Sequence, residues 1–277
     1  PHLLVMTATP IPRSLALTIY GDLDLSIIDE MPPGRQPIET TIFYPRERER
    51  AYAFIRSQVE QGKQAFIIYP LVEESEEIDA LAAVEEHARL QKEIFPKLQL
   101  GLLHGRMKAE EKDRIMSQFR DGELHILVST SVVEVGVDIP NASVMLVEGA
   151  NRFGLAQLHQ FRGRVGRSSH QSYCILIPAT PDKAENERLA AMTETNDGFV
   201  LAERDLEQRG PGDFLGTRQA GYSGLRLANL ADIHLIEKAR RLAQGLFDSD
   251  PALERAEHKV LANRLDAFWS QNPSDIS

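Results

Sequence analysis

Short apolar runs alternate with longer amphipathic stretches over most of the chain. The apolar runs predict buried β-strands at residues 40–44, 65–69, 98–103, 124–129, 144–148 and 172–177. The amphipathic stretches between them predict helices at 46–61, 76–93 and 109–120. Strands that alternate with helices of this length form a parallel sheet covered on both faces, so the expected fold class is α/β.

Apolar positions predict which face of each helix turns toward the core. In 46–61 these positions are Ala51, Phe54, Ile55 and Val59, and in 76–93 they are Ile78, Leu81, Ala82 and Ala88. The acidic residues at 73–77 suit the positive end of a helix dipole. We therefore expect no metal site in this charge run.

The alternation stops after Pro178. Residues 183–194 and 199–208 predict two helices joined by a turn at 195–198, which together form a helical hairpin. A glycine-rich loop with charged residues follows at 209–221. Two further helices end the chain, with inward positions predicted at Leu235, Ala239, Leu242 and Leu246 and at Leu261, Leu265 and Phe268.

Breaks in this pattern divide the chain into four parts. Pro32-Pro33-Gly34-Arg35 is a cluster of residues that interrupt helices and strands, and it marks a domain boundary. We predict the C-terminal remnant of one domain at 1–31 and a complete α/β domain at 32–179. The hairpin and its loop occupy 180–224, and the C-terminal helices occupy 225–277.

Residues 157–167, with the sequence QLHQFRGRVGR, place Arg164 and Arg167 close to Gln160. If the stretch is one helix, Gln160, Arg164 and Arg167 share a face. Glycine inside a helix costs about 1 kcal/mol relative to alanine, which indicates a close backbone approach at Gly163 and Gly166. Planar guanidinium groups suit phosphate oxygens. The alternative is an arginine-rich helix end that makes surface salt bridges.

Two other apolar runs end in small hydroxyl residues. The run at residues 2–6 is followed by Thr7-Ala8-Thr9. The run at 126–129 is followed by Thr130 and then by Gly136 and Asp138. Ligands of open α/β sheets bind beyond the carboxyl ends of the strands. Gly136 permits a close backbone approach. Asp138 is a candidate acceptor for a ribose hydroxyl or for an arginine of 157–167, and the alternative is that it only caps a turn.

Composition restricts the class of protein. Asp and Glu number 41 against 31 Lys and Arg, and the net charge of −10 argues against nonspecific coating of nucleic acid while allowing a local basic stripe. The one cysteine, Cys174, excludes a disulfide framework and indicates a reducing compartment. No apolar run is long enough to span a membrane and no signal peptide opens the chain, so we expect a cytoplasmic protein.

These stretches resemble the motifs of superfamily 2 helicases and translocases. Residues 157–167 resemble motif VI, 126–140 motif V, 7–9 motif III and 67–72 motif IV, while 103–107 match the adjoining L-H-G-x-M motif. The resemblance implies that 32–179 is the second of two RecA-like motor domains.

The resemblance also implies a nucleotide site. Arg164 and Arg167 would act as arginine fingers across the cleft between the two motor domains. Gln160 would contact the acidic motif that holds Mg²⁺. Gly136 and Asp138 would line the nucleotide, together with Gly163.

The resemblance implies two further roles for motif residues, which are the coupling of the nucleotide state to DNA binding and direct contact with DNA. Thr7, Ala8 and Thr9 would couple the nucleotide state to nucleic-acid binding. Arg106 and Thr130 would contact the DNA backbone.

Further segments resemble the RecG family of bacterial double-stranded DNA translocases, at 29–35, 154–160, 196–199 and 205–219. In that family the hairpin and the loop after it convert closure of the nucleotide cleft into movement of the duplex. Arg209, Arg218 and Gln219 would then grip DNA. The segment Gly216-Thr217-Arg218-Gln219 favours this family over the transcription-repair coupling translocases, in which Gly-Glu-Glu-Gln is typical.

The resemblance implies ATP and Mg²⁺ as cofactors and branched or forked duplex DNA as a partner, with single-stranded-DNA-binding protein as a candidate partner. The sequence contains neither a G-x-x-x-x-G-K-[ST] phosphate loop nor an Asp-Glu-x-His motif. We therefore expect a first motor domain to hold most of the ATP and Mg²⁺, and this chain alone to be inactive. A transcription-coupled translocase and a noncatalytic interaction module stay open as alternatives.

Overall fold

The computed structural model describes residues 34–70, 76–130, 138–180, 183–209 and 233–271, together with residues 4, 6, 26–28 and 30. They form two compact units, one containing the residues from Asp29 to Leu201 and the other the residues from Ala202 onward. Thr7, Ala8, Thr9, Gly136, Arg218 and Gln219 lie outside the described residues, so their predicted roles stay predictions.

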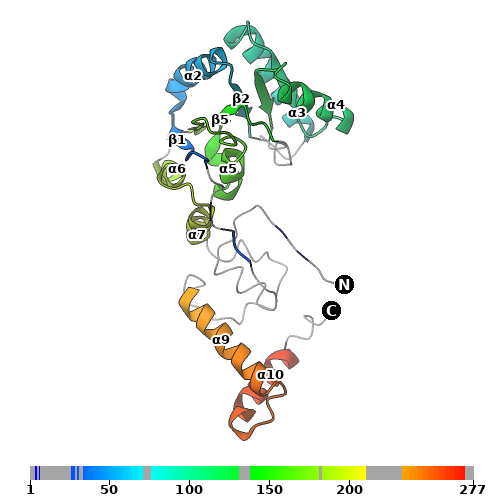
Figure 1. Ribbon diagram of the computed structural model, residues 1–277, viewed down its shortest axis with the longest axis vertical. Helices are drawn as coiled ribbons and strands as arrows, with labels where there is room; N and C mark the ends of the chain where they lie inside the picture. Colours follow the sequence, from blue (N-terminus) through cyan, green and yellow to red (C-terminus); the bar gives the residue numbers. More distant parts are fainter. Residues whose placement is uncertain are drawn as a thin grey trace. The chain divides into compact units, whose positions relative to one another are not determined.

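The first unit is built on a six-stranded, wholly parallel sheet (Figure 1). Its strands are β1 (Glu39–Ile42), β2 (Gln64–Ile68), β3 (Leu100–Leu103), β4 (Ile126–Ser129), β5 (Ala142–Glu148) and β6 (Tyr173–Ile177), in the spatial order β1-β6-β5-β2-β4-β3. Every predicted strand of the α/β domain is present, which confirms the predicted fold class.

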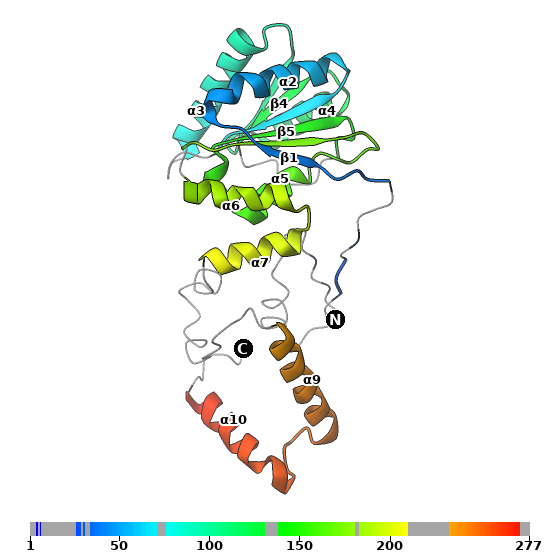
Figure 2. The same ribbon diagram turned by 90° about the vertical axis from the view of Figure 1, so that its left-hand side faces the viewer.

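Helices cover both faces of this sheet, as Figure 2 shows. Residues on one face pack with α2 (Arg48–Glu60) and with α3 (Glu76–Arg89) and the π-helix that extends it, Leu90–Ile94. Residues on the other face pack with α4 (Ala109–Arg120), α5 (Leu155–Arg162) and α6 (Lys183–Glu194).

The two cores follow from the alternation of side chains along each strand. In β2, Phe66 and Ile68 belong to the cluster on the α4–α5–α6 face, whereas Ala65 and Ile67 belong to the opposite cluster. All five residues of β2 are buried. Strands buried on both faces have continuous apolar sequences, which explains why they stand out in the sequence as unbroken runs.

The predicted inward face of α3 is wrong. Leu81 is 59% exposed, while Ala83 and Leu90 are buried. The helix is anchored instead by polar contacts, including one between His87 Nε2 and the carbonyl oxygen of Leu100 at 3.3 Å. Since this helix consists largely of alanine and glutamate, its apolar positions do not define a single stripe.

The helix predicted over 157–167 is also wrong at its C-terminal end. Helix α5 ends at Arg162, and Gly163 is its C-cap. Gly166 has φ of +74°, a left-handed conformation that favours glycine and lies outside any helix. Arg164 and Arg167 therefore lie in a tight turn segment and do not share a helical face with Gln160.

Gly166 nevertheless makes the close approach that its sequence context predicts. A Cβ atom at this position would lie 2.8 Å from Ile38 Cγ1. Gly163 makes no such approach, because the nearest atoms to a Cβ there are carbonyl oxygens of its own helix at 3.4 and 3.5 Å. Glycine at 166 allows the segment to lie against the start of β1.

The two helices predicted after the sheet, and the turn between them, are present. Helix α6 is followed by α7 (Gly198–Arg209), and the Asp197 carboxylate accepts hydrogen bonds from the backbone N–H groups of Phe199 at 2.8 Å and Val200 at 3.5 Å. This N-cap explains why α7 begins where it does. Arg209 is the last residue of α7.

The second unit contains α9 (Ile233–Ser249) and α10 (Lys259–Gln271). Asp250 organises the segment between them, accepting hydrogen bonds from the backbone of Glu254 and Arg255 and a 2.7 Å contact from His258 Nδ1. Apolar side chains predicted to turn inward are exposed in the described structure, among them Leu235, Leu242, Leu261 and Leu265.

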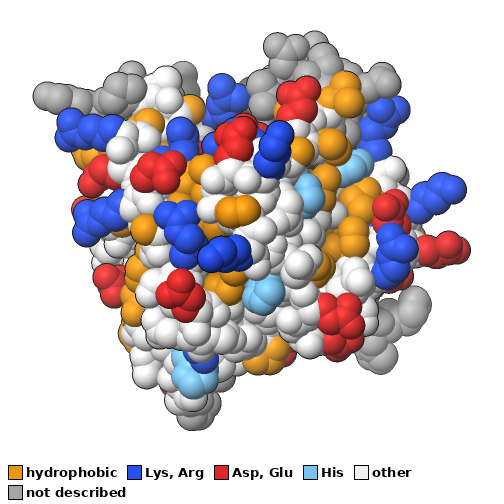
Figure 3. Space-filling model, turned by 90° about the horizontal axis from the view of Figure 1, so that it is seen from above, with side chains coloured by type: hydrophobic (Ala, Val, Ile, Leu, Met, Phe, Trp, Pro, Cys, Tyr) orange, Lys and Arg blue, Asp and Glu red, His pale blue; other side chains and the backbone are white. Residues whose placement is uncertain are grey.

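Charged side chains of both signs are interspersed on the face of the molecule seen in Figure 3. No described helix has the length and apolar character required to cross a membrane.

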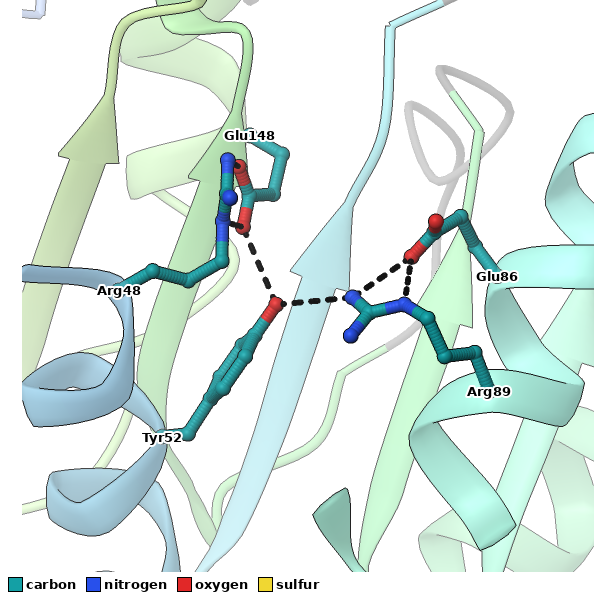
Figure 4. A network of polar contacts seen from close by, with 5 residues as sticks. All are labelled: Arg48, Tyr52, Glu86, Arg89 and Glu148. Atoms are coloured by element: carbon teal, nitrogen blue, oxygen red, sulfur yellow. Dashed lines mark hydrogen bonds and ion pairs between the residues drawn. The ribbon is translucent and has the colours of Figure 1, made fainter. Parts of the chain in front are cut away.

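A polar network fastens α2 and α3 to the carboxyl end of β5 (Figure 4). Glu148, with 6% of its side chain exposed, accepts two hydrogen bonds from Arg48, from Nε at 2.8 Å and from Nη2 at 3.0 Å. The Tyr52 hydroxyl lies 3.3 Å from Glu148 and accepts from Arg89, which pairs with Glu86. The Glu148 carboxylate raises the pKa of Arg48.

We predict that Arg48→Gln destabilises the first unit by about 1–3 kcal/mol, because the buried Glu148 carboxylate loses its two-bond partner. Urea unfolding followed by far-ultraviolet circular dichroism measures the change. The matched control is Arg114→Gln, since Arg114 is an exposed residue of α4. That control should change stability by less than about 0.5 kcal/mol, and equal effects of the two substitutions would contradict the prediction.

We also predict that Gly166→Ala is more destabilising than Gly122→Ala. Both residues have positive φ, +74° and +80°, so both variants bear the cost of about 1–2 kcal/mol for a left-handed alanine. Only Gly166 faces a neighbour, since a Cβ at Gly122 would meet nothing within 4 Å. The difference between the two urea midpoints isolates the contact with Ile38, and it should vanish in the background of Ile38→Ala.

Candidate nucleotide and DNA site

Three of the predicted motif segments meet at the carboxyl edge of the sheet. The backbone N–H of Tyr69, at the end of β2, donates to the Ser129 carbonyl oxygen at 2.9 Å. The N–H of Thr130, at the end of β4, donates to the Leu103 carbonyl oxygen at 3.2 Å. The segments that follow β2, β3 and β4 are therefore held side by side, because parallel strands end at the same edge.

The predicted DNA-binding residues of this edge differ in accessibility. Arg106 is exposed in the loop after β3. Thr130 is 2% exposed, and Ser129 Oγ donates to its carbonyl oxygen at 2.8 Å. His104 is partly buried, which lowers the pKa of its imidazole, as expected for a structural residue. The DNA contacts predicted for Arg106 and Thr130 stay predictions.

Residues 162–167, the arginine segment, lie at the amino-terminal ends of the strands. Arg167 Nη1 donates to Asp138 Oδ1 at 3.2 Å, and Arg167 Nε donates to the Gly163 carbonyl oxygen at 3.2 Å. Asp138 comes just before β5, and the Gly166 contact residue Ile38 comes just before β1. This cluster is therefore near the amino-terminal ends of β1 and β5, away from the edge that carries Arg106 and Thr130.

The Arg167–Asp138 contact matches one of the two partners that the sequence indicates for Asp138. The Asp138 side chain is 65% exposed and that of Arg167 is 23% exposed. An ion pair this accessible to water contributes at most about 1 kcal/mol and exchanges readily with other charged groups. Arg164 and Gln160 are half-buried nearby in the sequence, with Gly163 exposed between them.

A third arginine of the same stretch points inward. Arg162 is 2% exposed, and its Nη1 donates to the carbonyl oxygens of Met192 and Thr195, both at 2.9 Å. Those carbonyls belong to the C-terminal end of α6 and to the hairpin turn. Arg162 Nη2 lies 3.1 Å from His159 Nδ1. Burial, with a smaller effect of Arg162, lowers the pKa of His159 to about 4, so this imidazole is neutral at pH 7 and accepts the bond.

An arginine of α6, Arg188, contacts the segment that precedes α5. Arg188 Nη2 donates to the carbonyl oxygens of Asn151 and, at 3.2 Å, of Phe153, in the turn that leads into α5. Asn151 Oδ1 also accepts from the backbone N–H of Ala179, just after β6, at 2.7 Å. Helix α6 is thus held at its middle by Arg188, which contacts the turn before α5 at the carboxyl edge, and at its C-terminal end by Arg162.

These contacts define what the site can do chemically. The Arg167 guanidinium, oriented by Asp138, is suited to bind phosphate oxygens. Within the described part of the chain, no cluster of three or more His, Cys, Asp and Glu residues is placed to hold a metal ion. The described geometry therefore offers one positive charge, on Arg167, that is suited to an anionic group.

Arg162 and Arg188 were not among the candidate site residues derived from the sequence. Arg162 follows Phe161 and precedes the buried Val165, so it falls on the inward side of the stretch. A cation at an inward position of an apolar helix is a recognisable signal, because burial of a charge requires compensating partners. Nothing in the sequence identifies main-chain carbonyls as those partners.

Two family models match the chain. The helicase conserved C-terminal domain matches residues 48–169, and the model of ATP-dependent DNA helicase RecG, domain 3, C-terminal, matches residues 195–274. The first match covers strands β2 to β5 and the arginine segment, and the second covers the hairpin turn and the helices beyond it.

Curated relatives match nearly the whole chain. The ATP-dependent DNA helicase RecG of Synechocystis sp. is 54% identical over 255 residues, which cover 92% of this chain and 31% of that protein. RecG of Thermotoga maritima is 52% identical over 87% of this chain and 31% of the relative. RecG of Escherichia coli K12 is 48% identical over 92% of this chain and 37% of the relative. The chain therefore spans about a third of the length of these relatives.

A solved structure described as RecG bound to a three-way DNA junction has the same fold. Its TM-score is 0.67 and its sequence identity is 49%, covering 83% of this chain and 30% of that chain. With the match to the RecG domain 3 model and the identity of these relatives along almost all of the chain, the sequence belongs to the RecG family of ATP-dependent DNA helicases.

Proposed function

We propose that this chain provides the second motor domain and the translocation hairpin of an ATP-driven translocase that remodels forked and branched duplex DNA. The observation that carries the proposal is that the predicted DNA-binding residues and the predicted nucleotide-binding residues lie at opposite edges of one sheet. Predicted DNA contacts lie at the carboxyl edge, and the Arg167–Asp138 pair lies beside the amino-terminal ends of the strands. A motor needs both surfaces and a rigid body between them.

In this proposal the nucleotide is bound between this chain and a first motor domain. ATP supplies the phosphoryl group whose transfer to water drives the motor, and Mg²⁺ is held mainly by the first domain. Arg167 and Arg164 neutralise the charge that develops on the phosphoryl oxygens. Asp138 holds the Arg167 guanidinium in place until phosphate replaces it, which a weak, exposed ion pair permits.

DNA binding is assigned to the carboxyl edge and to the segment after α7. Arg106 and Thr130 would contact the backbone at the edge. Arg209 would contact it from the end of α7, and Arg218 and Gln219 from the residues that follow α7 in the sequence. Phosphate contacts of this kind position a protein on DNA without reading sequence. The junction-bound relative supports branched DNA as the substrate.

The alternatives have less support. The match of 195–274 to the RecG domain 3 model favours a fork-remodelling enzyme over a transcription-repair coupling translocase. A noncatalytic module has no need of an arginine oriented by an aspartate toward solvent. A cytoplasmic location and an interaction with single-stranded-DNA-binding protein stay predictions.

The decisive test is a chimera in which this chain replaces the matching residues of the Escherichia coli relative. On a model fork, Arg167→Ala should lower ATP turnover by about 10³-fold or more while nucleotide binding is retained, as for loss of an arginine finger. Arg120→Ala, an exposed arginine at the end of α4, is the control and should leave turnover unchanged. Turnover that survives Arg167→Ala would refute the assignment.

We further predict that the 277-residue chain alone does not hydrolyse ATP above background, because it contains no phosphate loop. Phosphate release by the isolated chain, with and without forked DNA, checks this. The unsubstituted chimera is the positive control. Hydrolysis by the isolated chain would mean that it contains a complete nucleotide site.

A further inference from the structure

We infer that Arg162 is a positioning residue that links the arginine segment to the translocation hairpin. Through Arg162, a displacement of residues 162–167 at the nucleotide is carried to the turn between α6 and α7. The inference rests on the proposed function and assigns a new role within it. Arg162 itself would contact neither nucleotide nor DNA.

The first argument is the unusual environment of this side chain. Arg162 is the largest fully buried side chain of the described residues. Its hydrogen-bonding partners are all neutral groups: the carbonyl oxygens of Met192 and Thr195, His159 Nδ1, and Thr40 Oγ1 at 3.5 Å. Burial lowers the pKa of the guanidinium, which reflects the cost of removing it from water. Such a charge adds little to stability, so its geometry is the more informative property.

The two carbonyl groups that Arg162 binds are at the C-terminal end of α6. The last carbonyl groups of a helix have no partner within the helix and carry the negative end of its dipole. Arg162 binds one carbonyl in the last turn of α6 and one just beyond it, and so it caps α6. The next residues form the turn that Asp197 closes as the N-cap of α7. The hairpin turn is therefore fixed on its α6 side by a residue of α5.

The third argument is the position of Arg162 in the chain. It is two residues before Arg164 and five before Arg167, so one short segment carries a guanidinium that binds the end of α6 and another that binds Asp138. Between them Gly163 ends the helix, and Gly166 lies against Ile38. A short segment held by these contacts cannot move at one arginine without moving the others. The hairpin turn lies at the same end of the sheet as the Arg167–Asp138 pair, so the path between them is short.

The test separates ATP consumption from DNA movement. In the chimera, Arg162→Met removes the charge and both carbonyl contacts while keeping an unbranched apolar stem of similar length. We expect ATP turnover on forked DNA within about 3-fold of the unsubstituted chimera and at least a 10-fold drop in base pairs unwound per ATP hydrolysed. A purely structural role would lower ATP turnover and the unwinding rate together, in proportion to the folded fraction, and would leave the number of base pairs unwound per ATP unchanged.

Two further variants complete the design. Arg162→Lys keeps the charge and should restore part of the ratio. It also replaces Arg162→Met as the test if that variant does not fold, and the expected drop is then about 3-fold. Thr40→Val removes only the longest contact of Arg162 and should leave the ratio unchanged.

The outcomes distinguish the two levels of the proposal. An unchanged ratio of base pairs unwound per ATP in a folded Arg162→Met variant, or in Arg162→Lys if it carries the test, would overturn the role of Arg162 alone. Loss of that ratio in Thr40→Val as well would also overturn it, since general repacking would then explain both results. Failure of Arg167→Ala to reduce turnover would instead refute the proposed function.

Discussion

The parallel direction of all six strands is the constraint on which the rest of the structure depends. It gives the sheet two chemically different edges, because the loop after each strand begins at one edge and the loop before each strand ends at the other. The segments after β2, β3 and β4 are joined at the first edge by backbone hydrogen bonds. At the second edge, the segments before β5 and β6 supply Asp138 and Arg167, and Gly166 lies against Ile38, which precedes β1. Strands buried on both faces keep these two ends at a fixed separation.

Electrostatics in this fold act mainly through geometry. The Arg48–Glu148 pair and the Arg162 and Arg188 contacts each join elements that are distant in sequence. Arginine suits this task because its planar fork offers several donors in fixed directions. Helix α6 runs from the carboxyl edge of the sheet toward the opposite edge, and it is held at its middle by the contacts of Arg188 and at its C-terminal end by Arg162. It therefore belongs mechanically to the motor domain, although the chain leaves the sheet before it begins.

The sequence predicts the sheet and the hairpin well because their signals are local. Runs of β-branched and aliphatic residues mark strands buried on both faces, and Asp197-Gly198 marks the start of α7. It predicts the end of α5 poorly, since apolar Val165 extends the helical periodicity past Gly163, while the left-handed conformation of Gly166 depends on tertiary packing against Ile38. The sequence also does not predict that Tyr52 is buried. Its hydroxyl group donates to the Glu148 carboxylate, which is ninety-six positions away in the chain. Arg162 could be recognised from sequence as an anomaly, but its partners could not.

The partners of Arg162 have a consequence for how related sequences diverge. Met192 and Thr195 contribute main-chain oxygens, which every amino acid possesses. Their side chains can therefore change during evolution without loss of the contact, provided that α6 keeps its length. Methods that infer residue contacts from correlated substitutions detect pairs of side chains that change together, and such a pair does not exist here. The connection between the arginine segment and the hairpin would be invisible to them, however many relatives were aligned.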